Sequence, residues 1–261
     1  IARPSHADYS AYCKYHGYED YRGGGHFSGR ITAPIVAVGA VLIKALERLG
    51  IKIGTHILKC ADVADRAFDD ITADIDLLNG MSFPVLNADA EGEMVEKIAA
   101  ARADGDSVGG ILQTAVAGIP AGVGEPWFDS VEGLLSHALF SIGGIKGVSF
   151  GDGFGLATLR GSEANDAFAL KDGRVITQTN KSGGINGGIT NGMPIIFTTA
   201  IKATPSIACA QQSVNLNTME TVPLEVKGRH DPCIVPRAVP CVEAAVAVAV
   251  ADVMLEAGQW I

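Results

Sequence analysis

The residues best suited to chemistry begin at the N-terminal end, in residues 3–9 (RPSHADY). His6 stands three residues after Arg3, and Pro4 restricts the backbone between them. A histidine held near an arginine could act as a general acid beside a bound anion. A histidine satisfied within an ordered turn would give the same pattern, and this segment taken alone favours that second interpretation.

A glycine-rich segment follows at residues 21–30 (YRGGGHFSGR) and leads into an expected helix. Consecutive glycines expose backbone N–H groups, and a helix start adds partial positive charge, so together they favour phosphate or carboxylate binding. Arg30 adds a fork of donors. The GxxxxGK[ST] pattern of a P-loop is absent. A flexible glycine turn is the alternative, and the anion site is slightly favoured because Ser28 and Arg30 fall at the helix start.

Residues 180–192 (NKSGGINGGITNG) hold paired glycines at short spacing. Such pairs permit the close approach of a planar or phosphorylated ligand. They are equally typical of tight turns between strands, so this signal is weak by itself.

A last polar segment, residues 228–237 (GRHDPCIVPR), precedes the C-terminal helix. Its arginines, His230 and Asp231 could bind an anion and supply a base, although a helix-capping turn would explain the same residues. Cys233 and His230 lack partner ligands at suitable spacing, so no metal site is predicted.

Composition limits the class of protein. The 261 residues carry a net charge of −9, whereas duplex-binding proteins are usually basic, so no nucleic-acid partner is expected. A small anionic substrate needs only a local cationic pocket. Five cysteines without a CxxC pair favour a reduced, cytoplasmic protein over a disulfide framework. The most apolar stretch, residues 244–251, is far shorter than the ~20 residues that cross a bilayer, so no membrane partner is expected.

Hydrophobic periodicity predicts the elements that would position these segments. With no linker or repeat, residues 1–261 are expected to form a single domain of α and β elements, too irregular for a parallel βαβ sheet. Residues 61–90 are acidic and polar and are expected to form a surface excursion, and the C-terminal helix is apolar on nearly every face, which predicts burial on most sides. The expected helices are 33–49, 91–103, 131–142 and 239–256, and the expected strands are 51–57, 108–117, 146–150, 194–201 and 221–226.

Taken together, the four segments indicate an enzyme that acts on a small anion with a phosphorylated cofactor. In order along the chain, six blocks resemble chorismate synthase: RPSHADY, KYHGYEDYRGGG, GIPAGVGEPWFD, SIGGIKGVSFGDGF, GGINGGITNG and GRHDPCIVPRAVP. The resemblance extends from residue 1 to the C-terminal helix. Six ordered blocks make it specific.

The resemblance implies a lyase that converts 5-enolpyruvylshikimate 3-phosphate to chorismate and phosphate by a 1,4-elimination. This is the last common step of aromatic amino acid biosynthesis. It implies a need for reduced FMN without net oxidation, with NADPH as one source of the electrons and an external reductase as the other. It also implies an α+β fold, a β-α-β sandwich with helices packed between antiparallel sheets, and a homotetramer.

Site residues follow from the same resemblance. His6 is similar to the family histidine that protonates or stabilises reduced flavin, and Asp231 is similar to the carboxylate near flavin N5. The substrate-binding arginines correspond to Arg3, Arg30 and Arg229, the last also lying by the flavin. The expected FMN contacts are Ser28, Gly143, Gly144, Gly187, Lys202, Ala203, Thr204, Pro205 and Ser206, together with His26 and Phe27.

The sequence departs from the family pattern in three places. His26-Phe27-Ser28-Gly29-Arg30 replaces the common Arg-Ser-Ser-Ala-Arg, and Lys202-Ala203-Thr204-Pro205-Ser206 replaces Lys-Pro-Thr-Ser/Pro-Ser. The family's N-terminal Gly-Glu-Ser-His-Gly motif, which carries a second catalytic histidine, is absent from the 261 residues. We therefore expect these residues alone not to turn over. A flavin- or nucleotide-binding protein without lyase activity and a structural subunit are the alternatives.

Overall fold

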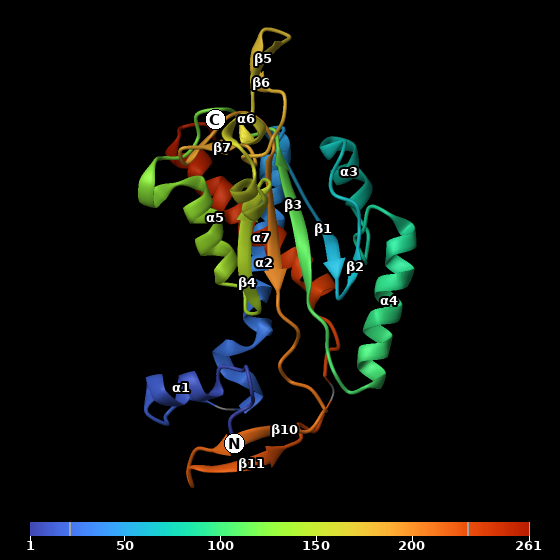
Figure 1. The fold of residues 1–261 in the computed structure, drawn as a ribbon. Helices are drawn as coiled ribbons and strands as arrows, with labels where there is room; N and C mark the ends of the chain where they lie inside the picture. Colours follow the sequence, from blue (N-terminus) through green and yellow to red (C-terminus); the bar gives the residue numbers. More distant parts are fainter. Residues whose placement is uncertain (21, 229, 261) are drawn as a thin grey trace.

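The centre of the protein is one antiparallel sheet, seen in the computed structural model of residues 1–20, 22–228 and 230–260 (Figure 1). Its strands are β1 (Lys52–Cys60), β2 (Val63–Ala64), β3 (Gly110–Ala117), β4 (Ile145–Phe150) and β9 (Ile195–Ile201). The order is β2-β1-β3-β9-β4, and every neighbouring pair is antiparallel. The expected α+β class with antiparallel sheets is confirmed.

A helical layer packs on this sheet. α7 (Val235–Glu256) contacts β1 and β3, α2 (Ala33–Arg48) contacts α7, and α5 (Val131–Phe140) contacts α7 and β4. Beyond the β1–β2 edge lie α3 (Ile71–Leu78) and α4 (Ala88–Ala103) (Figure 1). The side chains between sheet and helices form one apolar core, in which Leu46, Leu112 and Phe197 are fully buried.

Shorter elements complete the described residues. α1 (Asp8–Tyr15) and the 3₁₀ turns Arg22–Phe27 and Gly29–Thr32 precede α2. Three two-stranded sheets and a short helix lie outside the main sheet, and two further 3₁₀ turns are Trp127–Asp129 and Gly153–Thr158. The pairs are β5 (Phe168–Lys171) with β6 (Arg174–Thr177), β7 (Ile185–Asn186) with β8 (Ile189–Thr190), and β10 (Gln211–Asn215) with β11 (Glu220–Leu224), and the helix is α6 (Gly161–Ala164).

Most of the expected long elements are present within a few residues of their expected ends. One expectation is wrong: residues 61–90 are not only a surface excursion. They include α3, whose Ile75 and Leu78 are buried because this helix packs on β1. α7 also begins four residues earlier than expected, since a proline such as Pro236 is tolerated in the first helical turn.

α7 is the core helix that its composition predicts. Thirteen of its residues are buried, among them Val242, Val246 and Val250. Among the described residues, two helical segments could cross a membrane by length and composition alone: Val235–Glu256, which is mostly buried in the protein, and Gly29–Arg48, which is mostly not. The apolar part of α7 therefore extends well beyond the eight residues 244–251.

The contact between α2 and α7 depends on one glycine. A Cβ atom placed on Gly39 would overlap the Cβ and Cα atoms of Ala244. Because part of this overlap is with backbone, no side-chain rotation could relieve it. The two helices therefore cross in direct backbone contact, and a larger residue at position 39 would separate them.

We expect Gly39→Ala to lower the free energy of unfolding, because overpacking costs about 1–3 kcal/mol. This loss should outweigh the ~1 kcal/mol that alanine gains in helix propensity. Urea unfolding followed by circular dichroism measures it. The matched control is Gly92→Ala in α4, where nothing lies within 4 Å of the added Cβ, and which should stabilise by roughly 0.5–1 kcal/mol. Equal stabilisation by both changes would contradict the close crossing.

Candidate functional site

The N-terminal motif forms a compact group of three side chains. Arg3 donates from Nε to Asp8 Oδ2 and from Nη2 to Asp8 Oδ1, both at 2.8 Å. His6 Nδ1 lies 2.7 Å from Asp8 Oδ1 and 3.2 Å from Arg3 Nη2. The shorter distance favours an Nδ1–H that donates to the carboxylate, since Arg3 has its own bonds to Asp8. Nε2 of His6 is then left for a ligand.

Asp8 holds this group together as an ion. Burial acts to raise the pKa of Asp8, but the hydrogen bonds and charge of Arg3 outweigh it and hold the pKa at about 2. The hydrogen bond to Asp8 in turn raises the pKa of Arg3. The carboxylate is therefore charged throughout the working pH range, which fixes the orientation of both partners.

The triple-glycine turn lies directly against His6. Gly24 has a φ of +85°, and a Cβ placed on it would lie 4.0 Å from His6 Nε2 and 3.6 Å from Ser28 Cβ. The missing side chain leaves room beside the imidazole. Ser28 caps the next turn by accepting from the backbone N–H of Arg30 at 3.3 Å. The Arg30 side chain is exposed, and it forms no ion pair within the described residues.

A lysine from the far end of the sequence joins this N-terminal segment to the sheet. Lys202, directly after β9, donates from Nζ to the carbonyl of Ser5 at 2.6 Å. Its backbone N–H donates to the carbonyl of Gly144 at 3.0 Å. Gly144, which follows Gly143 before β4, has a φ of +100°, a conformation that favours glycine. Three segments predicted as site segments therefore meet at one end of the sheet.

Residues 203–206 continue along the same end. Ser107 Oγ donates to the carbonyl of Thr204 at 2.7 Å, while the hydroxyl of Thr204 is itself buried without a hydrogen-bond partner in the described part of the chain. Ser206 Oγ lies 3.2 Å from His230 Nδ1, which connects this segment to the last motif. Ala203 is exposed, and Pro205 is partly buried.

The expected base, Asp231, is partly exposed and forms an ion pair. Arg237 Nη1 donates to Asp231 Oδ2 at 2.8 Å, across the first turn of α7. The neighbouring Pro232 carbonyl accepts from Val108 N–H at 2.8 Å, which fixes the loop against the start of β3. Arg229, the third expected substrate-binding arginine, lies outside the described residues.

Not every expected residue lies at this end. Gly187 stands in the turn between β7 and β8, which is at the opposite end of the sheet from α1 (Figure 1). His26 and Phe27 are exposed and stack on each other, with ring centroids 4.5 Å apart. His26 also lies 3.3 Å from the hydroxyl of Tyr15. Within one chain, no hydrogen bond, ion pair or ring contact among the described residues joins Gly187, His26 or Phe27 to Thr204.

Asp8 is the residue that the sequence interpretation missed. It lies in the same RPSHADY motif as His6, two residues further along. A carboxylate at that spacing from both an arginine and a histidine was the available signal. The motif therefore supplies both the imidazole and the anion that orients it.

Comparisons with known proteins identify the family. A family model described as chorismate synthase matches residues 1–255. The chorismate synthase of Thermococcus kodakarensis is 47% identical over 258 residues, which are 99% of this chain and 71% of that relative. That of Dehalococcoides mccartyi is 44% identical, covering 98% and 70%. A crystal structure of chorismate synthase matches with a TM-score of 0.78 at 28% identity, covering 95% of this chain and 70% of the other. The chain belongs to the chorismate synthase family, the lyases that convert 5-enolpyruvylshikimate 3-phosphate to chorismate and phosphate.

Proposed function

We propose that the elimination takes place at the end of the sheet where β9 leads into Lys202, with reduced FMN and the anionic substrate bound side by side, in a protein that also carries the Gly-Glu-Ser-His-Gly motif. The observation that carries the proposal is the 2.6 Å hydrogen bond from Lys202 to the carbonyl of Ser5. It joins the Arg3–His6–Asp8 group to the segment that ends in Ser206, although the two lie 197 residues apart. An acid–base group and a ligand-binding segment thus share one surface.

The residues present fit a phosphorylated flavin. The buried Thr204 hydroxyl has no partner among the described residues, and such a group usually has one in a native structure. Gly24 leaves backbone without a side chain beside His6, and the backbone of Gly144 accepts a hydrogen bond from Lys202. We propose that Thr204 and its neighbours Lys202, Ala203, Pro205 and Ser206 hold the cofactor, with Ser28, Gly143 and Gly144 completing the contacts and His26 and Phe27 at the margin.

The substrate presents a phosphate and two carboxylates, and arginine binds such groups with two parallel hydrogen bonds. We assign this role to Arg3, Arg30 and Arg229. Arg30 suits it best, because its side chain is exposed and makes no ion pair within the described residues. Arg3 is already oriented by Asp8, so it can offer its remaining N–H groups in a fixed direction.

The elimination breaks a C–H bond on an unactivated carbon and the C–O bond to phosphate. Reduced FMN would supply electron density for the C–O cleavage and receive the departing hydrogen. His6 would hold a proton at Nε2, the nitrogen that Asp8 leaves available. Asp231 would take up a proton near the cofactor, and the hydrogen bond from Arg237 orients that carboxylate. We propose NADPH as the reductant, and an anaerobic assay with NADPH in place of dithionite tests this.

The position of Gly187 relates to how copies of the chain would assemble. Because it lies at the far end of the sheet, it could serve this site only from another copy of the chain (Figure 1). The outer side of α2 is also apolar, with Val38 54% and Val41 69% exposed. Exposed apolar surface of this kind is typical of subunit contacts. We therefore propose a homotetramer of copies that complete each other's sites, located in the cytoplasm, where five free cysteines would stay reduced.

We expect Thr204→Val to weaken FMN binding about tenfold, the effect of losing one good hydrogen bond to a charged group. Isothermal titration calorimetry with FMN and with riboflavin measures this change in affinity. Riboflavin should bind poorly to the unmodified protein and to the variant. Thr199→Val is the matched control, because the Thr199 hydroxyl in β9 is also buried without a partner but lies within the sheet. An unchanged FMN affinity in Thr204→Val would remove this threonine from the cofactor site.

In a protein that also carries the Gly-Glu-Ser-His-Gly motif, we expect Asp231→Asn to slow single-turnover formation of chorismate by roughly 10²–10⁴, the usual loss when a proton-handling group is removed. Substrate affinity should change little, since asparagine keeps the shape. The companion variant Arg237→Gln removes the ion pair but leaves the carboxylate, and it should slow the reaction far less. If both variants are slowed equally, Asp231 acts through the ion pair and is not the base.

A further inference from the structure

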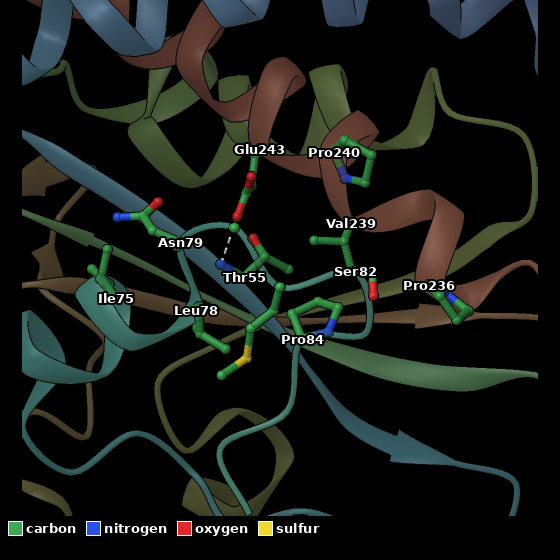
Figure 2. Close-up of a pocket in the computed structure, with 13 residues that line it drawn as sticks. Thr55, Ile75, Leu78, Asn79, Ser82, Pro84, Pro236, Val239, Pro240 and Glu243 are labelled. Carbon is green, nitrogen blue, oxygen red and sulfur yellow. Dashed lines mark hydrogen bonds between the residues drawn. The ribbon is translucent and has the colours of Figure 1, made fainter. Parts of the chain in front are cut away.

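A cavity lies between β1, α3 and α7 (Figure 2). Its volume is about 270 Å³. The walls come from the three elements and the loop after α3, and they expose polar and apolar surface in similar amounts. The lining residues are Gly54, Thr55, Ile75, Leu78, Asn79, Gly80, Met81, Ser82, Pro84, Pro236, Val239, Pro240 and Glu243.

α7 presents one face to this cavity. Pro236, Val239, Pro240 and Glu243 follow the i, i+3, i+4, i+7 spacing of a single helix face. Pro240 lies inside the helix and has no N–H, so it cannot donate to the carbonyl of Pro236. The carbonyl of Pro236 therefore lacks its usual helical donor. It lies on the same helix face as the carboxyl group of Glu243.

Glu243 reaches from α7 to the edge of β1, as the dashed line in Figure 2 shows. Its Oε1 accepts from the backbone N–H of Thr55 at 2.9 Å. Burial raises the pKa of Glu243 to about 7, against the lowering effect of this hydrogen bond. The carboxyl group therefore changes its ionisation near neutral pH.

No cation neutralises this carboxylate from the cavity walls. Glu243 is the one ionisable residue among those that line it. The charged side chains of Lys52 from β1 and Asp76 from α3 pair with each other at 2.6 Å. Arg66 is likewise paired with Asp74 of α3. The other polar groups of the lining, Asn79 and Ser82, make no side-chain hydrogen bond within the described residues.

We propose that this cavity is a binding site for a small primary amine, with the ammonium group on the Glu243 carboxylate and the apolar body against Ile75, Leu78 and Val239. An ammonium group carries three donors and no acceptor. The carboxylate of Glu243 is the acceptor with which it would pair, and an ion pair in a partly buried site is less screened than one in water.

The volume limits the size of the amine. A water molecule occupies about 30 Å³ in the liquid, so the cavity has room for roughly nine. A ligand with about eight non-hydrogen atoms therefore fits, and a nucleotide or a flavin does not. Benzylamine and cyclohexylamine have this size and are suitable probes.

Binding to an ionised carboxyl group has a defined pH dependence. The amine is a cation at neutral pH, and it pairs with Glu243 only after the carboxyl group has lost its proton. Affinity should therefore rise as the pH increases from 6 to 8, and the bound state should release a proton. A neutral ligand that accepts a hydrogen bond from the protonated carboxyl group would show the opposite dependence.

The experiment is calorimetric titration of the chain with benzylamine and cyclohexylamine at pH 6, 7 and 8, in buffers that differ in heat of ionisation. Benzyl alcohol and benzoate are the neutral and anionic comparison compounds. We expect both amines to bind, with about tenfold tighter binding at pH 8 than at pH 6 and release of up to one proton. Benzyl alcohol and benzoate should bind at least tenfold more weakly at pH 8.

Two variants distinguish the contribution of the carboxylate to amine binding from that of the cavity volume. Glu243→Gln keeps an acceptor for Thr55 N–H but loses the charge, and it should weaken amine binding at least tenfold and abolish its pH dependence. Leu78→Phe fills the cavity and leaves Glu243 in place, and it should also prevent binding. Asp76→Asn removes a neighbouring exposed carboxylate outside the lining and should leave amine affinity unchanged.

Circular dichroism establishes that each variant is folded. An NMR titration of ¹³C-labelled glutamate in the unmodified chain measures the pKa of Glu243 without any substitution. Saturating benzylamine should lower the pKa of the Glu243 carboxyl group. The proposal fails if neither amine binds at millimolar concentration, if benzyl alcohol binds as tightly as benzylamine at pH 8, or if Asp76→Asn weakens binding as much as Glu243→Gln.

Discussion

The backbone contact between Gly39 and Ala244 determines where the helical layer lies. α2 and α7 each begin with a segment that carries expected site residues, Ser28 and Arg30 before α2 and Asp231 before α7. Because a helix is a stiff element, the crossing point fixes how these two starting segments stand relative to each other. The spacing of the proposed site is therefore set some ten residues away from it, by the absence of a side chain.

The sheet supplies the other reference. β4 and β9 are adjacent and antiparallel, so the start of β4 and the end of β9 meet at one end of the sheet, with Gly144 beside Lys202. The N-terminal motif then attaches to this end through Lys202 and the carbonyl of Ser5. Segments that are distant in sequence thus become neighbours through strand register, which is fixed by burial of one face of each strand.

Much of this fold could be predicted from hydrophobic periodicity. α2, β3, β9 and the apolar α7 have long, regular patterns, and all are present. α3 was missed because its acidic residues conceal the two apolar residues, Ile75 and Leu78, that a three-residue spacing brings onto β1. The site motifs were recognisable as local patterns, and their order indicated the family. The proximity of these motifs in space was not predictable from their spacing, because the hydrogen bond between Lys202 and Ser5 is a tertiary contact. The orienting role of Asp8 appears only once its distances to Arg3 and His6 are known.

The hydrogen bond from Thr55 N–H to Glu243 also limits how the sheet can grow. β1 is bordered by the two-residue β2 only at its last residues, so most of its outer side would otherwise offer unpaired backbone groups to a strand from another molecule. A side chain of α7 occupies one of these amides, and the Pro84 carbonyl occupies that of Ile57. An added strand would have to displace both. These two contacts therefore oppose extension of the sheet across this edge.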